Sequence, residues 1–259
     1  MLKGKYVKYQ TDSGIFDLRD SHTQLNISFT ELTFIGRATG RNLTATNGVE
    51  IDVSSVASTG DLIIICGASD KKANDATAET ELVDAADDTT LSGGELLASN
   101  FSDPSSGINQ PLMSFFYWIY DGSTTPKVKF NVTQDTNAGT ALVFRGTSNT
   151  VSTGQATCVN NADINPAADS ATVPSDTTRL KVAFQSGRPG SSGISNVALN
   201  TNLTGQTGWI FYDGANQPDS TDSMDDAYLI LGPADSDSGL QITEDGSRTS
   251  IAFASLNVT

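Results

Sequence analysis

The 259-residue chain has little of what a catalytic or metal centre is usually built from. It contains 1 histidine and 2 cysteines, too few for a zinc site of the usual ligand sets. His22 lies far in sequence from any serine or cysteine motif, so we interpret it as an ordinary surface or capping residue. A Gly-x-Ser-x-Gly elbow and a glycine-rich phosphate loop are both absent. We therefore expect a protein that is not an enzyme and that binds no metal and no cofactor.

The two cysteines, Cys66 and Cys158, are too few and too far apart for a disulfide framework. Cys66 ends an apolar run and is expected to be a small core residue. A single bridge between the two cysteines stays open as the alternative to two separate thiols.

Long apolar runs are also missing. The longest are Leu62–Cys66 and Phe115–Tyr120, far short of the roughly 18 residues that a membrane-spanning helix needs. The basic leader MLKGKYVKYQ is not followed by the apolar stretch of a signal peptide. We expect a chain that is made and folded in a cytoplasm and that does not enter a membrane.

Positive charge is scarce, since 15 Lys and Arg face 30 Asp and Glu and the net charge is −15. This balance argues against nucleic-acid partners and against docking on an anionic membrane, because both need clustered cations. The charge is uneven: residues up to Arg41 hold 6 basic and 4 acidic side chains, and the remainder holds 9 and 26. A positive leader on a negative body suits an attachment device, although a solvated tail would have the same composition.

Acidic residues gather near the C-terminal end. Loop carboxylates can hold Ca²⁺, but a solvated turn is the default interpretation of such a cluster. The residues concerned are Asp219, Asp222, Asp225, Asp226, Asp235 and Asp237.

What the sequence has in plenty is Ser, Thr, Asn, Asp and Gly, which favours short strands joined by turns. Leu43 to Val53 predicts a hairpin turning at Asn47-Gly48. Asp61–Cys66 is apolar on both faces, which predicts a central strand. Residues 70–109 predict a long excursion between strands, which could hold a short helix over Ala76–Asp88, a short strand near Glu95–Ala98 or a binding surface.

Leu112–Tyr120 is the most apolar stretch, with aromatic side chains alternating to both faces. We interpret it as a core strand; the alternative is that one face meets another subunit or a ligand.

Further strands are expected along the second half of the chain. Lys127–Thr133 turns Val128 and Phe130 inward and is expected to pair with Thr140–Phe144. The apolar phase of the last strand changes between Phe253 and Leu256, which suggests a bulge. The remaining candidates are Leu180–Gln185, Trp209–Tyr212, Tyr228–Leu231 and Ser250–Val258.

Together these patterns predict an all-β protein, an antiparallel β-sandwich of the jelly-roll kind with an extended N-terminal arm. We expect residues 1–41 to form the attachment arm and residues 42–259 the sandwich.

Ser13-Gly14-Ile15-Phe16-Asp17-Leu18-Arg19-Asp20 resembles a short segment of tail-fibre and other virion structural proteins of tailed bacteriophages, with Phe16 in place of the usual Trp. A second likeness is to phage-encoded β-sandwich proteins with a Gly-Asp-Leu-Leu strand and an aromatic strand ending in Asp-Gly. Here those segments read Gly60-Asp61-Leu62-Ile63-Ile64 and Tyr117–Gly122.

These resemblances imply a structural protein of the virion, a tail or capsid appendage or decoration protein. The implied location is the virion, assembled in the host cytoplasm, and the implied partners are other virion proteins and further copies of this chain. We expect the arm to dock through Tyr6, Phe16, Leu18 and Arg19.

The alternative function is that of a glycan-binding adhesin or receptor-binding protein on a host-surface glycan. Trp209 and Tyr212 could stack on a sugar, and Asp213 could accept hydrogen bonds from its hydroxyls. Core packing is the default interpretation of Trp209.

Overall fold

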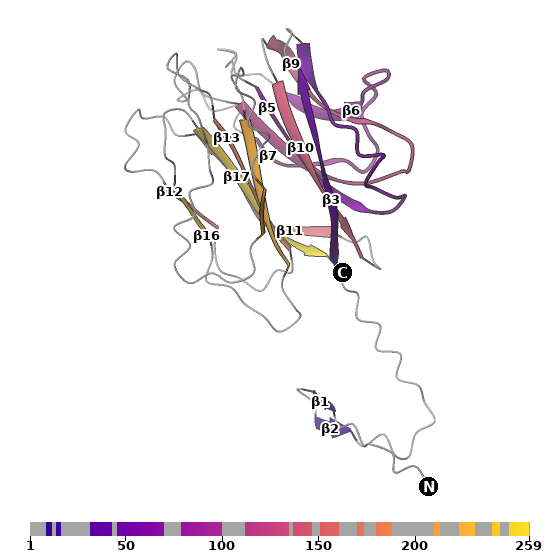
Figure 1. Cartoon of the computed structure of the whole chain (residues 1–259), viewed down its shortest axis with the longest axis vertical. Helices are drawn as coiled ribbons and strands as arrows, with labels where there is room; N and C mark the ends of the chain where they lie inside the picture. Colours follow the sequence, from indigo (N-terminus) through magenta and orange to yellow (C-terminus); the bar gives the residue numbers. More distant parts are fainter. Residues whose placement is uncertain are drawn as a thin grey trace. The chain divides into compact units, whose positions relative to one another are not determined.

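The computed structural model describes residues 9–11, 14–16, 32–42, 46–69, 79–99, 112–134, 137–146, 151–160, 170–173, 180–187, 210–212, 223–230, 240–243 and 249–258. The chain divides into two compact units, Met1–Thr30 and Glu31–Thr259 (Figure 1). The first unit contains an antiparallel pair, β1 (Tyr9–Thr11) and β2 (Gly14–Phe16).

The second unit is built from antiparallel sheets, and its described residues include no helix. The all-β, antiparallel prediction is therefore confirmed for the part of the chain that the structure describes.

A five-stranded sheet, here called the central sheet, has the order β3-β10-β5-β8-β7. Its strands are β3 (Thr33–Asn42), β10 (Asn137–Arg145), β5 (Leu62–Ser69), β8 (Leu112–Ile119) and β7 (Glu95–Ser99). The three-stranded sheet has the order β4-β9-β6. It consists of β4 (Thr46–Glu50), β9 (Pro126–Gln134) and β6 (Thr80–Asp84).

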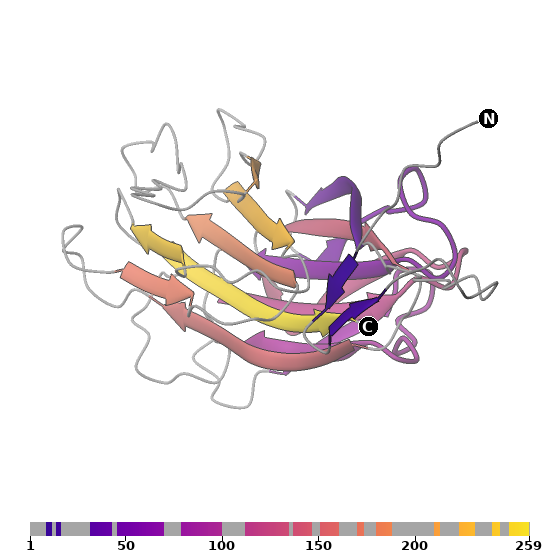
Figure 2. The same cartoon turned by 90° about the horizontal axis from the view of Figure 1, so that it is seen from below.

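The C-terminal sheet has the order β11-β17-β13-β15-β14. Its strands are β11 (Val151–Asn160), β17 (Thr249–Val258), β13 (Leu180–Gly187), β15 (Ser223–Ile230) and β14 (Ile210–Tyr212). A separate pair joins β12 (Ser170–Val173) to β16 (Leu240–Thr243). Figure 2 shows the C-terminal sheet, in orange to yellow, lying alongside the central sheet.

The inner strands of the central sheet, β10, β5 and β8, are buried on both faces, because a different layer packs on each. On one face its side chains meet those of the C-terminal sheet, as when the Phe115 and Phe184 rings approach to 5.9 Å between centroids. On the other face Ile63 and Ile65 pack with Val128 and Phe130 of the three-stranded sheet. Each large apolar side chain removed from water in these two cores stabilises the fold by roughly 1.5–3 kcal/mol.

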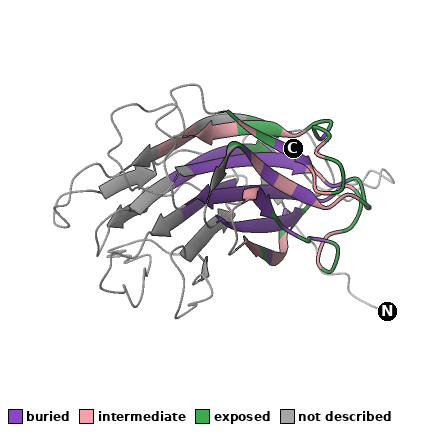
Figure 3. Ribbon diagram, turned by 90° about the horizontal axis from the view of Figure 1, so that it is seen from above, coloured by how far each residue is buried: buried purple, intermediate pink, exposed green. Residues whose placement is uncertain are grey.

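The strand β5 is buried at all eight of its positions (Figure 3). The prediction of a central strand at Asp61–Cys66 is thus confirmed. The neighbouring strand β8 behaves alike: Phe115 and Tyr117 enter one core, and Phe116 and Trp118 enter the other. The core interpretation of this aromatic strand is confirmed within the chain itself.

Three glycines, Gly40, Gly139 and Gly67, lie abreast on β3, β10 and β5 and are here called the glycine row. A Cβ at Gly40 would lie 1.8 Å from the Glu50 backbone oxygen, and one at Gly139 would lie 2.6 Å from Ile51 Cδ1. A Cβ at Gly67 would meet the Val128 side chain at 2.7 Å. The missing side chains therefore let residues 49–51 and β9 press directly onto the central sheet.

The predicted hairpin at Asn47-Gly48 is wrong. Both residues lie inside β4, which pairs with β9, and the register shifts between Thr46 and Gly48. A Cβ at Gly48 would lie 2.3 Å from the Val128 backbone oxygen. The glycine thus serves a close approach at a bulge rather than a turn.

The expected pairing of Lys127–Thr133 with Thr140–Phe144 is also wrong. β9 pairs with β4 and β6, whereas β10 pairs with β3 and β5. Ala141 to Phe144 are all fully buried, so this strand has no face to turn to water. Burial on both faces is satisfied in the middle of the central sheet, and the chain changes layers between β9 and β10.

The helix expected over Ala76–Asp88 is replaced by strand β6 at Thr80–Asp84, while residues 76–78 lie outside the described residues. The short strand near Glu95–Ala98 is confirmed as β7. Leu82 and Val83 are both buried, and their burial in a sheet outweighs the helical preference of the neighbouring alanines.

The expected bulge near Phe253 lies on the partner strand instead. The register of β11 against β17 shifts between Thr153 and Gln155, opposite Leu256 and Ser255. β17 itself alternates regularly, since Ala252, Ala254 and Leu256 all enter the first core.

Candidate functional site

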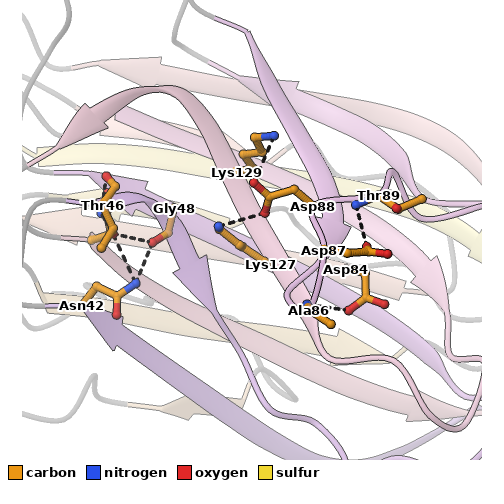
Figure 4. A network of polar contacts seen from close by, with 11 residues as sticks. Asn42, Thr46, Gly48, Asp84, Ala86, Asp87, Asp88, Thr89, Lys127 and Lys129 are labelled. Carbon is orange, nitrogen blue, oxygen red and sulfur yellow. Dashed lines mark hydrogen bonds and ion pairs between the residues drawn. The ribbon is translucent and has the colours of Figure 1, made fainter.

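The outer face of the three-stranded sheet carries a group of three charges. Lys127 and Lys129 alternate outward along β9 with the buried Val128 and Phe130. Lys127 Nζ lies 3.0 Å from Asp88 Oδ1, and Lys129 Nζ lies 3.2 Å from Asp88 Oδ2 (Figure 4). One carboxylate therefore holds two ammonium groups that would otherwise repel each other across one residue of strand.

Asp88 reaches the lysines from the turn that follows β6. The Asp88 amide donates to the Asp84 oxygen at 2.9 Å, and the Asp84 amide donates to the Thr89 oxygen at 2.8 Å. This turn sets Asp88 at a φ of 60°, a left-handed conformation that aspartate tolerates better than most residues. The hydrogen bond from Lys127 is the main cause of the lowered pKa of Asp88.

Neighbouring turns hold further carboxylates by their own backbone amides. Asp84 Oδ1 accepts from the Ala86 amide and Asp87 Oδ1 from the Thr89 amide, each at 2.9 Å (Figure 4). Asp121 Oδ1 accepts from the Ser123 and Thr124 amides, each at 2.8 Å. Such bonds fix the orientation of each carboxylate, so the turns present their oxygens as acceptors.

Hydrogen bonds within turns also lower the pKa values of Asp87, Asp52 and Asp121. The backbone bond from Thr89 lowers the pKa of Asp87, and the hydrogen bonds from Ser54 lower the pKa of Asp52. For Asp121 burial raises the pKa, but the hydrogen bonds from Thr124 and Ser123 outweigh it and bring the pKa below its usual value.

A shallow hollow of about 450 Å³ opens between the turn that follows β6 and the turn at residues 121–125. Its chemistry is that of carboxylates and hydroxyls, which attract cations and hydrogen-bond donors. Among the described residues no group of three or more possible metal ligands is assembled. The residues that line the hollow are Glu50, Asp84, Ala85, Ala86, Ser123, Thr124 and Thr125.

A second polar group lies at the opposite end of the three-stranded sheet. Asn42 Nδ2 donates to the Gly48 oxygen at 2.7 Å, and Thr46 Oγ1 donates to the same oxygen at 2.9 Å (Figure 4). Asn137 Nδ2 donates to Thr46 Oγ1 at 3.0 Å. These bonds tie β3 and β10 of the central sheet to the start of β4.

Tyr117 is buried on β8 beside Glu95 of the neighbouring strand β7. Burial, with a smaller contribution from a hydrogen bond to Glu95, raises the pKa of Tyr117 to about 12. The phenol is therefore neutral at physiological pH and donates a hydrogen bond rather than acting as a base.

Cys66 and Cys158 form no disulfide. Cys66 is buried in the core with the C-terminal sheet, as expected for a small core residue. The Cys158 thiol donates to the Met113 oxygen at 3.7 Å.

Most of the residues singled out from the sequence lie outside the described residues. These are Tyr6, Leu18, Arg19, His22, Trp209, Asp213, Asp219, Asp222, Asp235 and Asp237. Phe16 ends β2, Tyr212 ends β14, and Asp225 and Asp226 lie in β15, but their side chains are not described. The docking, glycan and Ca²⁺ hypotheses therefore stay predictions.

The sequence reasoning overlooked the Asp88 group. Its signal was present, because Lys-x-Lys on an alternating strand places both cations on one face, and an Asp-Asp pair follows β6. Knowing that β6 and β9 are neighbours was the missing step.

No protein-family model, curated protein or solved structure matches this chain. No helix in the described part of the chain is both long and apolar enough to span a membrane.

Proposed function

We propose that this chain is a structural protein of a tailed-phage virion, a tail or capsid appendage or decoration protein. Its N-terminal arm docks on a neighbouring virion protein, and its acidic body, a β-sandwich of the jelly-roll kind, faces outward. In this proposal copies of the chain also associate with one another, and the protein neither catalyses a reaction nor binds nucleic acid or a membrane.

One observation carries the proposal: the chain separates into two units of different character. Met1–Thr30 is compact apart from Glu31–Thr259. The first ten residues contain Lys3, Lys5 and Lys8 and no acidic residue, whereas residues 31–259 contain 11 basic and 27 acidic side chains. A short, separate basic segment is suited to bind a partner protein, while the strongly acidic body makes no contact with that partner.

The architecture of the body is consistent with a mechanical role. The inner strands of its central sheet are covered on both faces, and ion pairs join Asp88 to Lys127 and Lys129 on the outer face of the three-stranded sheet. Covered strands and paired charges of this kind stabilise a fold, which suits a protein that carries load.

The deletion that tests the arm must respect strand β3. Residues 33–42 pair with β10, so removing residues up to Arg41 would strip an edge strand from the central sheet. Removing residues 1–30 leaves every described strand of the second unit in place.

The experiment compares the full chain, the 1–30 deletion and a charge variant, Lys3→Glu with Lys5→Glu and Lys8→Glu. Each is expressed during phage production, and purified particles are analysed by mass spectrometry with cross-linking. We expect the full chain in the particle, with its leader lysines cross-linked to another virion protein, and both variants folded but missing from the particle. Full incorporation of the deletion variant contradicts docking through the arm. Absence of the full chain from particles contradicts the virion function altogether.

A further inference from the structure

Two buried oxygens at one end of the central sheet have no hydrogen-bond partner within the described part of the chain: Ser69 Oγ and Asn137 Oδ1. Ser69 is 0% exposed and Asn137 is 1% exposed. A buried polar atom left without a partner costs about 1–3 kcal/mol, so native proteins satisfy nearly all of them.

The two residues are direct neighbours. Ser69 ends β5, Asn137 begins β10, and their Cα atoms are register partners. Side chains opposite each other in an antiparallel pair have Cβ atoms about 4.5–5.5 Å apart.

Both side chains point to the same layer. Ser69 follows Ile63 and Ile65 at even spacing, and Asn137 precedes Ala141 and Val143 at even spacing; all four of these lie in the core with the three-stranded sheet. The hydrogen bond from Asn137 Nδ2 to Thr46 Oγ1 of β4 confirms this direction for Asn137.

The two oxygens can be satisfied together by one small molecule that both donates and accepts. A hydrogen bond to water spans about 2.8 Å, so a single water bridges oxygens up to about 5.6 Å apart. Buried waters sit at such places and usually make about three hydrogen bonds to otherwise unsatisfied groups.

We infer that Ser69 and Asn137 hold one buried water molecule between the central and three-stranded sheets. The water donates one hydrogen bond to Asn137 Oδ1. It makes a second hydrogen bond with Ser69 Oγ, in which either oxygen can be the donor. Because Asn137 Nδ2 is already bonded to Thr46, the water completes a polar clamp that runs from β5 through β10 to β4. The glycine row lies two residues further along the same strands. The water site therefore lies next to the place where the central and three-stranded sheets approach each other most closely.

The site is tested first by a crystal structure of the full chain at a resolution that resolves ordered waters. We expect one density peak within 2.6–3.2 Å of both oxygens, the usual hydrogen-bond range. A direct Ser69–Asn137 hydrogen bond, or a dry contact at this place, overturns the inference.

Thermal unfolding of Ser69→Ala provides a second test whose sign discriminates. If the hydroxyl is bridged by water, its removal lowers Tm by roughly 2–4 °C. If the hydroxyl is unsatisfied, its removal leaves Tm unchanged or raises it, which also overturns the inference.

Two control variants calibrate this comparison. Ser114 is equally buried, but its Oγ lies 2.7 Å from Ser99 Oγ, so Ser114→Ala must lower Tm. Among the described residues Thr80 Oγ1 is the third buried oxygen without a partner, and the side chain of Phe130, its register partner, has no oxygen with which to share a water. Thr80→Val therefore reports the response of an unbridged hydroxyl. Ser69→Ala is expected to follow the first control and not the second.

Discussion

Arg145 donates two parallel hydrogen bonds to Asp61, from Nε to Oδ1 and from Nη2 to Oδ2, each 2.7 Å long. The side chain of Asp61 is only 3% exposed, whereas that of Arg145 is 48% exposed. The Ser58 amide donates a third bond to Asp61 Oδ2 at 2.7 Å. The pair thus joins the start of β5 to the end of β10 and to the turn before β5.

Removing the cation of this pair leaves a buried carboxylate with one donor. We expect Arg145→Met to lower Tm by about 4 °C or more, because an uncompensated buried charge is costly. The double variant Asp61→Asn with Arg145→Met removes the charge as well and should recover part of the loss. Differential scanning calorimetry of both variants checks this, and an unchanged Tm for Arg145→Met would show that the pair contributes nothing.

Acid should destabilise the fold through the same carboxylate. Burial alone raises the pKa of Asp61, but the hydrogen bonds from Arg145 and Ser58 prevail and the pKa lies below its usual value. A carboxyl with a depressed folded pKa contributes stability above its unfolded pKa of about 3.9, and this stability is lost as pH falls through the folded value. The pKa values of Asp52, Asp87, Asp88 and Asp121 are lowered as well, so their effects have the same sign.

Urea unfolding at pH 7, 5, 4 and 3 measures how the free energy of unfolding depends on pH in the acid range. We expect the free energy of unfolding to change little from pH 7 to about 5 and to fall below about 4. Asp61→Asn should flatten the fall. An equal slope in the variant would assign the acid sensitivity to other groups.

The glycine row should be intolerant of the smallest side chain. Gly40→Ala places a Cβ 1.8 Å from a backbone oxygen of Glu50, which cannot move without shifting the chain. We expect a cost of about 3 kcal/mol or more in the free energy of unfolding. Gly36→Ala on the same strand is the matched control, because its Cβ would meet a side-chain methyl, Val56 Cγ1, at 3.2 Å, which needs a shift of only a few tenths of an ångström and should cost under about 1 kcal/mol. Equal costs for the two variants would mean that β4 does not press on the row.

Two effects of Asp88 can be separated by substitution. Asp88→Asn removes the charge that holds Lys127 and Lys129 but keeps a residue that tolerates positive φ, so it should cost about 0.5–1 kcal/mol and less in high salt. Asp88→Ala adds the cost of a left-handed conformation, roughly 1–2 kcal/mol more. Denaturant unfolding at low and high salt measures both, and a salt-independent cost for Asp88→Asn would exclude an ionic contribution.

The sequence was informative wherever burial was one-sided or complete. The alternation of Val128 and Phe130 with Lys127 and Lys129 predicted the faces of β9, and the unbroken apolar run at Leu62–Cys66 predicted the strand at the middle of a sheet. Periodicity reports how a strand meets its surroundings, so these two predictions needed no knowledge of its neighbours.

The failures concerned pairing, because a strand pattern does not name its partner. Asn47-Gly48 has the composition of a tight turn, yet the glycine is needed for contact with Val128 of a strand far along the chain. Lys181 alternates with Leu180 and Val182 as a solvent-facing residue would, but it is 0% exposed. The C-terminal sheet is thus covered on both faces at this position of β13, which the lysine concealed.

The candidate site was the least predictable part. The Asp88 group brings together β9 and the turn after β6, and the Asn137–Ser69 pair brings together the ends of β10 and β5. Each arrangement depends on strand order rather than on a local motif. Single polar residues in a chain so rich in Asn, Ser, Thr and Asp do not stand out from their background.

The position of β5 determines how its amide protons meet solvent. All eight of its residues are buried, and β10 and β8 flank it along its whole length. Neither fraying at an edge nor the opening of a surface turn exposes these amides, so their exchange with deuterium requires the loss of both cores together. The exchange rates at Ile63–Gly67 therefore report the global stability of the second unit, and a partner that binds its surface would be detected there without touching the strand.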